Sequence, residues 1–259
     1  MSIWQKPISQ NNLNTSQSFS NDDLTFDSPI NDDVATDNLD WITEIHVACV
    51  FILDTSGSMR QDDAIGRLNE GLKTFKEQTI TDSTFDEHTK ACIDVAIVSF
   101  GPNITVHQNF TPVSKMVPPT LTASGGTPMG AAINKALDMI TEQKAKYNKY
   151  GTPYYRPWVF CITDGGPNDN YASAAQRLKE MEDTKKVLGY CVGVENFDRQ
   201  TMLTIFNKDR IFELENLNFP ALFKFVSSSL STVRNSDPSG GRSVAVEAPK
   251  DLHTISIAF

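Results

Sequence analysis

The 259-residue sequence lacks several features that would assign it to a broad class of protein. It has no cluster of Lys and Arg, and its 32 Asp and Glu outnumber 23 Lys and Arg to give a formal net charge of −9. Because neutralisation of phosphates supplies most of the affinity of nucleic-acid-binding proteins, this composition argues against a general nucleic-acid binder. No run approaches the roughly 18 apolar residues of a membrane-spanning helix, so none is predicted.

The N-terminal residues contain no apolar stretch of the kind that marks a secretory signal, and we expect a cytoplasmic protein. The four cysteines are far apart and form no Cys-x-x-Cys pair, which argues against a zinc site. Each lies within an apolar run, so we expect buried free thiols, as in a reducing compartment. These cysteines are Cys49, Cys92, Cys161 and Cys191.

The acidic charge is concentrated in the first 40 residues. They hold seven Asp and a single Lys, a net charge of −6, whereas residues 41–259 carry a net charge of only −3. They are rich in Asn, Ser and Thr and have few large apolar side chains, so we expect residues 1–40 to form an acidic disordered leader. An ordered domain is expected over 41–234, followed by a linker and short C-terminal tail over 235–259.

Within the expected domain, apolar runs alternate with amphipathic segments. Continuous apolar runs are typical of strands buried on both faces, and apolar residues spaced three and four apart are typical of helices. Strands are predicted at 45–53, 92–100, 104–106, 158–163, 187–194 and 210–213. Helices are predicted at 63–79, 129–140, 174–181, 198–206 and 219–230. This alternation predicts an α/β fold: a doubly wound, Rossmann-like, mostly parallel six-stranded sheet with one short antiparallel edge strand and helices on both faces.

Three polar turns are expected to meet at one edge of this sheet. The turn directly after the first strand contains Asp54, Ser56 and Ser58. Thr127 precedes a helix, and Asp164 follows the strand at 158–163. Ligands of doubly wound sheets bind at the carboxyl ends of the strands, where the strand order reverses. The two carboxylates and three hydroxyls are all oxygen donors, which favours Mg²⁺, Mn²⁺ or Ca²⁺ over zinc or copper.

This set of residues resembles the metal-ion-dependent adhesion site (MIDAS) of the von Willebrand factor A (VWA) domain. Asp54-x-Ser56-x-Ser58, Thr127 and Asp164 match that motif at all five positions, and the resemblance covers residues 44–233. It implies that the three hydroxyls touch a metal, for which we expect Mg²⁺, and that the two Asp act mostly through water. It also implies that the open metal position accepts a Glu or Asp carboxylate from a partner protein.

The phrases GGTPMG and TDGGPND are similar to the bacterial TerY-like branch near tellurium-resistance proteins. That similarity implies a stress-response or phosphorylation-signalling system, with a kinase or phosphatase as partner. Because VWA domains generally bind proteins and do not catalyse reactions, we expect a non-enzymatic protein.

Two alternatives remain open. A Mg²⁺-dependent phosphoryl hydrolase of haloacid-dehalogenase type would also place an Asp after the first strand, but it needs a second Asp as general acid where this chain has Ser56. A structural scaffold, whose metal only stabilises the loops, would use the same five residues. The sequence has no GxxxxGK[ST] motif for a P-loop nucleoside triphosphatase and no His at this edge for a serine hydrolase.

Other charged residues allow two interpretations. Asp62 and Asp63 could form an adjacent metal site, although we favour negative charge at a helix N-terminus. The acidic leader could fold back and compete for the metal site, although we favour a solvating tail. The four histidines are scattered, and we expect structural or solvated roles for them. They are His46, His88, His107 and His253.

Overall fold

A computed structural model describes residues 44–83, 85–194 and 197–234, together with four short strands at 16–19, 26–27, 244–247 and 252–254. Its centre is a seven-stranded sheet in the order β11-β9-β8-β7-β3-β4-β5. The strands of this sheet are β3 (Val47–Asp54), β4 (Ile93–Phe100), β5 (Ile104–Pro112), β7 (Trp158–Thr163), β8 (Leu188–Val194), β9 (Ile211–Leu214) and β11 (Leu252–Thr254).

The six predicted strands are all present, and the predicted fold class is confirmed. β3, β4, β7, β8 and β9 are parallel to one another, and β5 runs antiparallel to β4 at the edge. β5 has nine residues and is longer than predicted, because alternate residues face solvent and interrupt the apolar run. β11 adds a second antiparallel edge strand beside β9, from the region predicted as the C-terminal tail.

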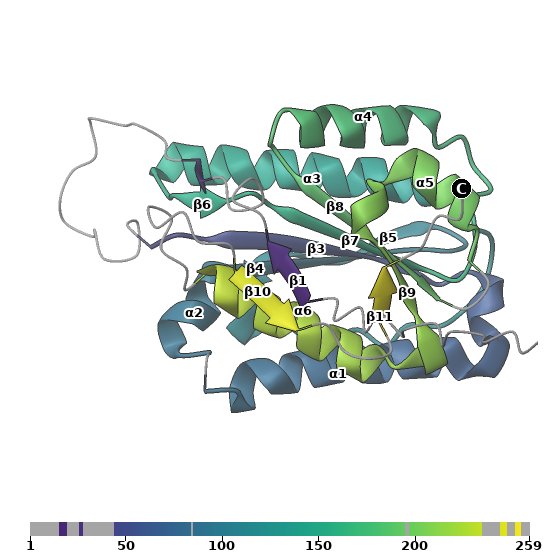
Figure 1. Cartoon of the computed structure of the whole chain (residues 1–259), viewed down its shortest axis with the longest axis horizontal. Helices are drawn as coiled ribbons and strands as arrows, with labels where there is room; N and C mark the ends of the chain where they lie inside the picture. Colours follow the sequence, from purple (N-terminus) through teal and green to yellow (C-terminus); the bar gives the residue numbers. More distant parts are fainter. Residues whose placement is uncertain are drawn as a thin grey trace, which may run out of the picture.

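Helices cover both faces of the sheet (Figure 1). One layer contains α3 (Met129–Tyr150), α4 (Ala172–Asp183) and α5 (Arg199–Ile205), and the other contains α1 (Ala64–Thr81), α2 (Glu87–Cys92) and α6 (Phe219–Arg234). α3 extends ten residues beyond the predicted end, since its second half buries polar Gln143 and Tyr147, which the apolar pattern does not mark. α2 was not predicted, because six residues are too few for a helical period to show.

Side chains of β3 alternate between two apolar layers. Phe51 and Leu53 face the layer of α1 and α6, whereas Val50 and Ile52 face the layer of α3. The Phe51 ring lies 5.3 Å from a ring on each of these two helices, Phe75 on α1 and Phe223 on α6. All four cysteines are buried free thiols, as predicted.

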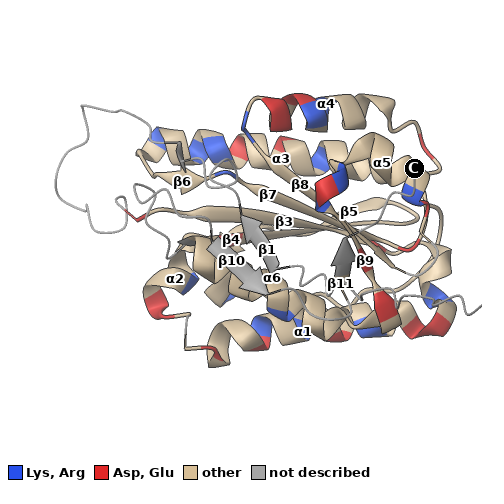
Figure 2. Cartoon of the chain, viewed as in Figure 1, with Lys and Arg blue, Asp and Glu red and all other residues tan. Residues whose placement is uncertain are grey.

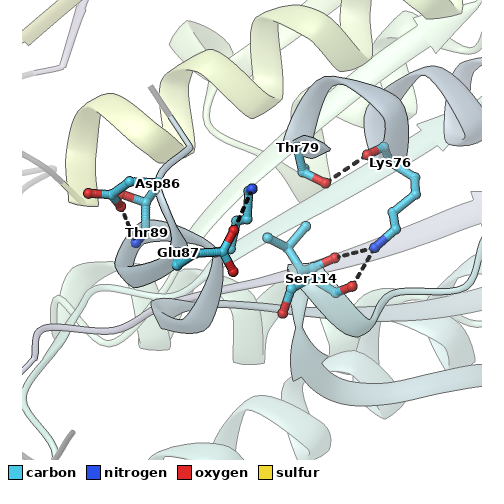
Figure 3. A network of polar contacts seen from close by, with 8 residues as sticks. Lys76, Thr79, Asp86, Glu87, Thr89 and Ser114 are labelled. Carbon is cyan, nitrogen blue, oxygen red and sulfur yellow. Dashed lines mark hydrogen bonds and ion pairs between the residues drawn. The ribbon is translucent and has the colours of Figure 1, made fainter. Parts of the chain in front are cut away.

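Polar contacts tie α1 to the segment that follows β5 (Figure 3). The Lys76 ammonium donates to the carbonyl oxygens of Val113 and Ser114, at 3.1 and 2.6 Å. Burial lowers the pKa of Lys76. In the same view the Asp86 carboxylate caps α2 by accepting from the backbone N–H of Thr89 at 2.7 Å. The two hydrogen bonds of Lys76 hold the start of the long connection from β5 to α3 against α1.

Both signs of charge occur along the helices. In the cartoon of Figure 2, Lys and Arg are interspersed with Asp and Glu. Among the described residues, no helix combines the length and the apolar character needed to cross a membrane.

Two further strand pairs involve the predicted leader and tail. β1 (Ser16–Phe19) pairs with β10 (Val244–Glu247), and β2 (Phe26–Asp27) pairs with β6 (Tyr154–Tyr155), both antiparallel. β6 precedes β7, so β2 lies at the amino-terminal end of the parallel strands. The other residues of the predicted disordered leader and of the tail lie outside the described part of the chain.

Candidate metal centre

The strand order reverses between β3 and β7. From β3 the chain steps outward to β4 and β5, and then returns through α3 to β7 on the other side of β3. Leu53 near the end of β3 pairs with Ile162 near the end of β7, so both strands end at the same level. Asp54 is the last residue of β3 and Asp164 is the first after β7, which places both carboxylates at this switch point.

Four of the five predicted site residues belong to one hydrogen-bonded chain. Asp54 Oδ1 accepts from the backbone N–H of Ser56 at 2.7 Å, and its Oδ2 accepts from the Thr163 hydroxyl at 2.6 Å. The hydroxyls of Ser56 and Ser58 lie 2.9 Å apart. Ser58 then donates to Asp164 Oδ1 at 2.8 Å. The first and third predicted turns are therefore in direct contact through the residue types that the motif requires.

Backbone hydrogen bonds bring the Thr127 loop against the other two turns. The N–H of Gly57 donates to the carbonyl of Gly125 at 3.1 Å, and the N–H of Asn168 donates to the carbonyl of Thr127 at 3.0 Å. Within the described part of the chain, the Thr127 hydroxyl has no hydrogen-bond partner. The structure thus brings the Thr127 backbone to both carboxylate-bearing turns and leaves its hydroxyl available.

Gly125 is required for this loop geometry. Its φ angle is +77°, a left-handed conformation that residues with a Cβ rarely adopt. A Cβ at this position would also lie 2.4 Å from the backbone nitrogen of Pro102. Only glycine therefore lets the loop before Thr127 approach the turn after β4.

Two residues at the site were missed by the sequence reasoning. Thr163 bonds Asp54, and Asp169 accepts from the N–H groups of Gly130 and Ala131 at 3.0 and 2.9 Å. These are first-turn N–H groups of α3, so Asp169 caps the helix after Thr127 from a distant turn. No spacing in the sequence distinguishes either residue, because each acts across about 40 or more intervening positions.

α3 begins at Met129, so Pro128 is its N-cap residue and Thr127 precedes the helix. The helix begins at the predicted residue. Pro128 has no N–H, which suits a position at the helix N-terminus, where backbone N–H groups have no intrahelical partner.

Burial raises the pKa of both carboxyls. Burial raises the pKa of Asp54 to about 6, and the charge of Asp164 adds to this, against hydrogen bonds from Ser56 and Thr163 that lower it. Burial also raises the pKa of Asp164, which is only partly buried. A divalent cation beside them would favour the charged form of both groups.

The donor set fits a hard divalent cation. No group of three or more His, Cys, Asp or Glu side chains that could hold a metal occurs among the described residues. The site instead combines two carboxylates with serine and threonine hydroxyls, an all-oxygen set of the kind that Mg²⁺, Mn²⁺ and Ca²⁺ accept.

Asp62 and Asp63 lie at the start of α1 and are exposed. Asp63 directly precedes the helix, and its carboxylate lies over the first turn, where a Cβ on Gly66 would come within 2.5 Å of both its oxygens. This position suits negative charge at a helix N-terminus, the interpretation favoured from the sequence.

A second polar cluster lies at the opposite end of the sheet. His46 Nδ1 is 2.7 Å from Asp94 Oδ2, and the Tyr147 hydroxyl donates to the same oxygen at 2.5 Å. Burial by itself would lower the pKa of His46, but hydrogen bonds to Asp94 and Cys92 and the charge of Asp94 raise it to about 9. The pair joins the start of β3 to β4, which is a structural role.

Doubly wound α/β domains with a site made only of oxygen donors at the switch point of the sheet form a class of ligand-binding domains. The family model described as "von Willebrand factor type A domain" matches residues 49–225, more than half of the chain. The chain belongs to the von Willebrand factor type A domain family.

The chain is similar to the collagen alpha-4(VI) chain of Mus musculus, with 25% identity over 194 residues, 72% of this chain and 8% of that chain. Among solved structures it is similar to the pilus adhesin SpaC of Lactobacillus rhamnosus GG (TM-score 0.56, 13% identity, covering 73% of this chain and 31% of that one). It is also similar to proximal thread matrix protein 1 of the mussel byssus (TM-score 0.51, 15% identity, 82% and 49%).

These structures share the fold. The chain spans less than a tenth of the collagen chain's length, about a third of the adhesin and about half of the byssus protein.

Proposed function

We propose that this protein is a metal-dependent protein-binding module. Domains of its family are in general non-enzymatic protein-interaction modules. In this proposal the hydroxyls of Ser56, Ser58 and Thr127 bind Mg²⁺ directly. A Glu or Asp carboxylate of a partner protein then takes the open metal position.

The observation that carries the proposal is the hydrogen-bonded chain from Asp54 through Ser56 and Ser58 to Asp164. The Ser56 and Ser58 hydroxyls lie 2.9 Å apart and the Ser58 hydroxyl lies 2.8 Å from Asp164 Oδ1, so three oxygen donors are close enough together to surround one small cation. Ser58 is exposed and Asp164 is partly exposed, so the site opens to solvent, where a partner can reach it.

The structure also supports an indirect role for Asp54. Its side chain is fully buried, and each of its two oxygens already accepts a short hydrogen bond. It is therefore better placed to orient Ser56 and to supply negative charge than to bind the metal itself. Neutral hydroxyl ligands leave much of the cation's charge uncompensated, and this favours capture of an external carboxylate.

A phosphoryl hydrolase is less well supported. Where such an enzyme needs a general acid, the chain has the Ser56 hydroxyl, which is buried against Ser58 and does not transfer a proton near pH 7. The similarity of GGTPMG and TDGGPND to TerY-like proteins leads us to place the partner among the kinases or phosphatases of a cytoplasmic bacterial stress-response system.

The test is capture of partners from a lysate by the immobilised chain, in Mg²⁺ and in EDTA. We expect capture that needs Mg²⁺ and is lost in Thr127→Ala, while Thr81→Ala, at the far end of α1, behaves as wild type. Capture that survives both EDTA and Thr127→Ala would support a scaffold. Metal-dependent release of phosphate from a generic ester, abolished in Asp54→Asn, would support the enzyme.

A further inference from the structure

A small polar pocket lies beside the proposed metal site. It has a volume of about 140 Å³ and lies between the β4–β5 edge of the sheet and the segment that leads to Thr127. Six of its lining residues carry hydroxyls: Thr55, Ser99, Thr105, Thr120, Thr122 and Ser124. No Lys, Arg, Asp or Glu lines it.

The pocket shares a wall with the metal site. Thr55 stands between Asp54 and Ser56 in the chain, and its hydroxyl donates to the carbonyl of Phe100 at 2.8 Å, toward the end of β4. The backbone carbonyl of Thr55 accepts from the N–H of Ser124 at 2.7 Å. The turn that carries the metal-binding serines therefore also forms one side of the pocket.

The pocket is uncharged. Its one titratable residue is His107, whose Nε2 lies 2.8 Å from the Ser99 hydroxyl. Burial lowers the pKa of His107, which favours the neutral form of its ring. The lining offers no opposite charge to a charged side chain, and it offers hydrogen bonds that an apolar side chain cannot use.

Several lining groups are available for a ligand. In the described part of the chain, the hydroxyls of Thr105, Thr120 and Thr122 and the amide of Asn103 have no hydrogen-bond partner. The volume exceeds that of a single water site but is below the roughly 300–1,000 Å³ of small-molecule and cofactor pockets. A single side chain fits it better than a free cofactor.

We propose that this pocket binds an uncharged hydrogen-bonding side chain, Asn, Gln, Ser or Thr, that neighbours the metal-bound carboxylate in the partner protein. The inference rests on the proposed function and adds a sequence preference to it. An extended chain rises about 3.3 Å per residue, so a side chain one or two positions from the acidic residue is the expected occupant.

The experiment uses the full chain on a peptide array. Each peptide has a central Asp or Glu, and the two residues on either side are varied among Asn, Gln, Ser, Thr, Leu, Lys and Asp. In Mg²⁺ we expect one flanking position to favour the uncharged polar residues over Leu, Lys and Asp by roughly threefold to tenfold, the contribution of one hydrogen bond.

Thr105→Val and Thr122→Val, tested separately, remove hydroxyls from two sides of the pocket, and each should reduce this preference. Thr81→Val is the matched control and should keep it, and circular dichroism shows whether each variant is folded. Mg²⁺-dependent retention without a flanking preference, or a preference that both variants keep, would overturn the pocket inference alone. If the array retains no peptide, or if peptides stay bound in EDTA, the proposed function is overturned and the pocket inference with it.

Discussion

Replacement of Asp54 by Asn separates the stability of the metal-free domain from its response to metal. Asp54 is fully buried at the end of β3, and burial raises the pKa of its carboxyl from 3.8 to about 6. Asn has nearly the same shape and no charge. The variant therefore removes one negative charge. Burial of that charge destabilises the metal-free domain, and a divalent cation needs it for binding.

The magnitude follows from this raised pKa. A raised pKa means that the folded state holds its proton more tightly than the unfolded state does, so the metal-free domain loses stability as pH rises from about 4 through about 6. A shift of roughly two pH units corresponds to about 3 kcal/mol above pH 6. Asn presents an NH₂ group to one of the two donors, Ser56 N–H or Thr163 O–H, which costs about 1 kcal/mol.

In EDTA at pH 8, Asp54→Asn should thus be more stable than wild type by about 1–2 kcal/mol. The difference should disappear below pH 4, where the wild-type carboxyl is protonated in both states and presents an O–H donor to Ser56 N–H or Thr163 O–H, as the Asn amide presents its NH₂ group. In Mg²⁺ at about 100 times its dissociation constant, wild type should gain about 2.7 kcal/mol and the variant should gain little.

Urea denaturation measures all of these differences, at several pH values and with EDTA or Mg²⁺. Comparison of the variant with wild type at each pH cancels the titration of other groups, including His46. Asp62→Asn is the matched control, because Asp62 is exposed outside the hydrogen-bonded chain, and it should keep the response to Mg²⁺. A variant that is less stable than wild type in EDTA at pH 8, or that keeps the full Mg²⁺ response, would refute the reasoning.

Four further predictions follow from the same structure. Thr127→Ala should abolish the rise in melting temperature that Mg²⁺ causes, whereas Thr127→Ser, which keeps the hydroxyl, should retain most of it. Because the folded pKa of His46 is about 9, wild type should lose about 3 kcal/mol of unfolding free energy from pH 6.5 to 9, and His46→Gln should not show this loss in urea denaturation. Gly125→Ala should lower the unfolding free energy by at least about 1 kcal/mol in the same assay, since its φ is +77° and a Cβ would clash with Pro102. Deletion of residues 1–40 should leave the affinity for an acidic peptide unchanged, because β2 pairs with β6 at the end of the sheet opposite Asp164. Fluorescence anisotropy measures this affinity, and a rise in affinity would indicate competition by the leader.

Most of the fold was predictable because four of the six predicted strands, β3, β4, β7 and β8, are buried on both faces. Such strands read as continuous apolar runs, and the run at 158–163 coincides with β7. β5 was predicted too short, since its partly exposed residues alternate with exposed ones. α2 and the two-residue β6 were missed, because neither is long enough to show a period.

The candidate site was predictable in its residue types, and its supporting contacts were not. Asp54, Ser56 and Ser58 stand close together in the sequence, and the order of Thr127 and Asp164 matches a known motif. The roles of Thr163 and Asp169 were hidden, since each depends on which distant turn the fold places beside it. The polar pocket was equally hidden, because its lining comes from the turn after β3, from β4 and β5 with the turn between them, and from the segment before Thr127.

The sequence by itself determined the alternation of strands and helices and the oxygen donors at the ends of the strands, because hydrophobic periodicity and residue chemistry are local properties. Only the tertiary structure decided that Ser58 bonds Asp164 across 106 positions, that Asp54 is fully buried, and that an uncharged pocket adjoins the site. Distances, burial and pKa values depend on the packing of segments that are remote in the chain, and no local pattern encodes that packing.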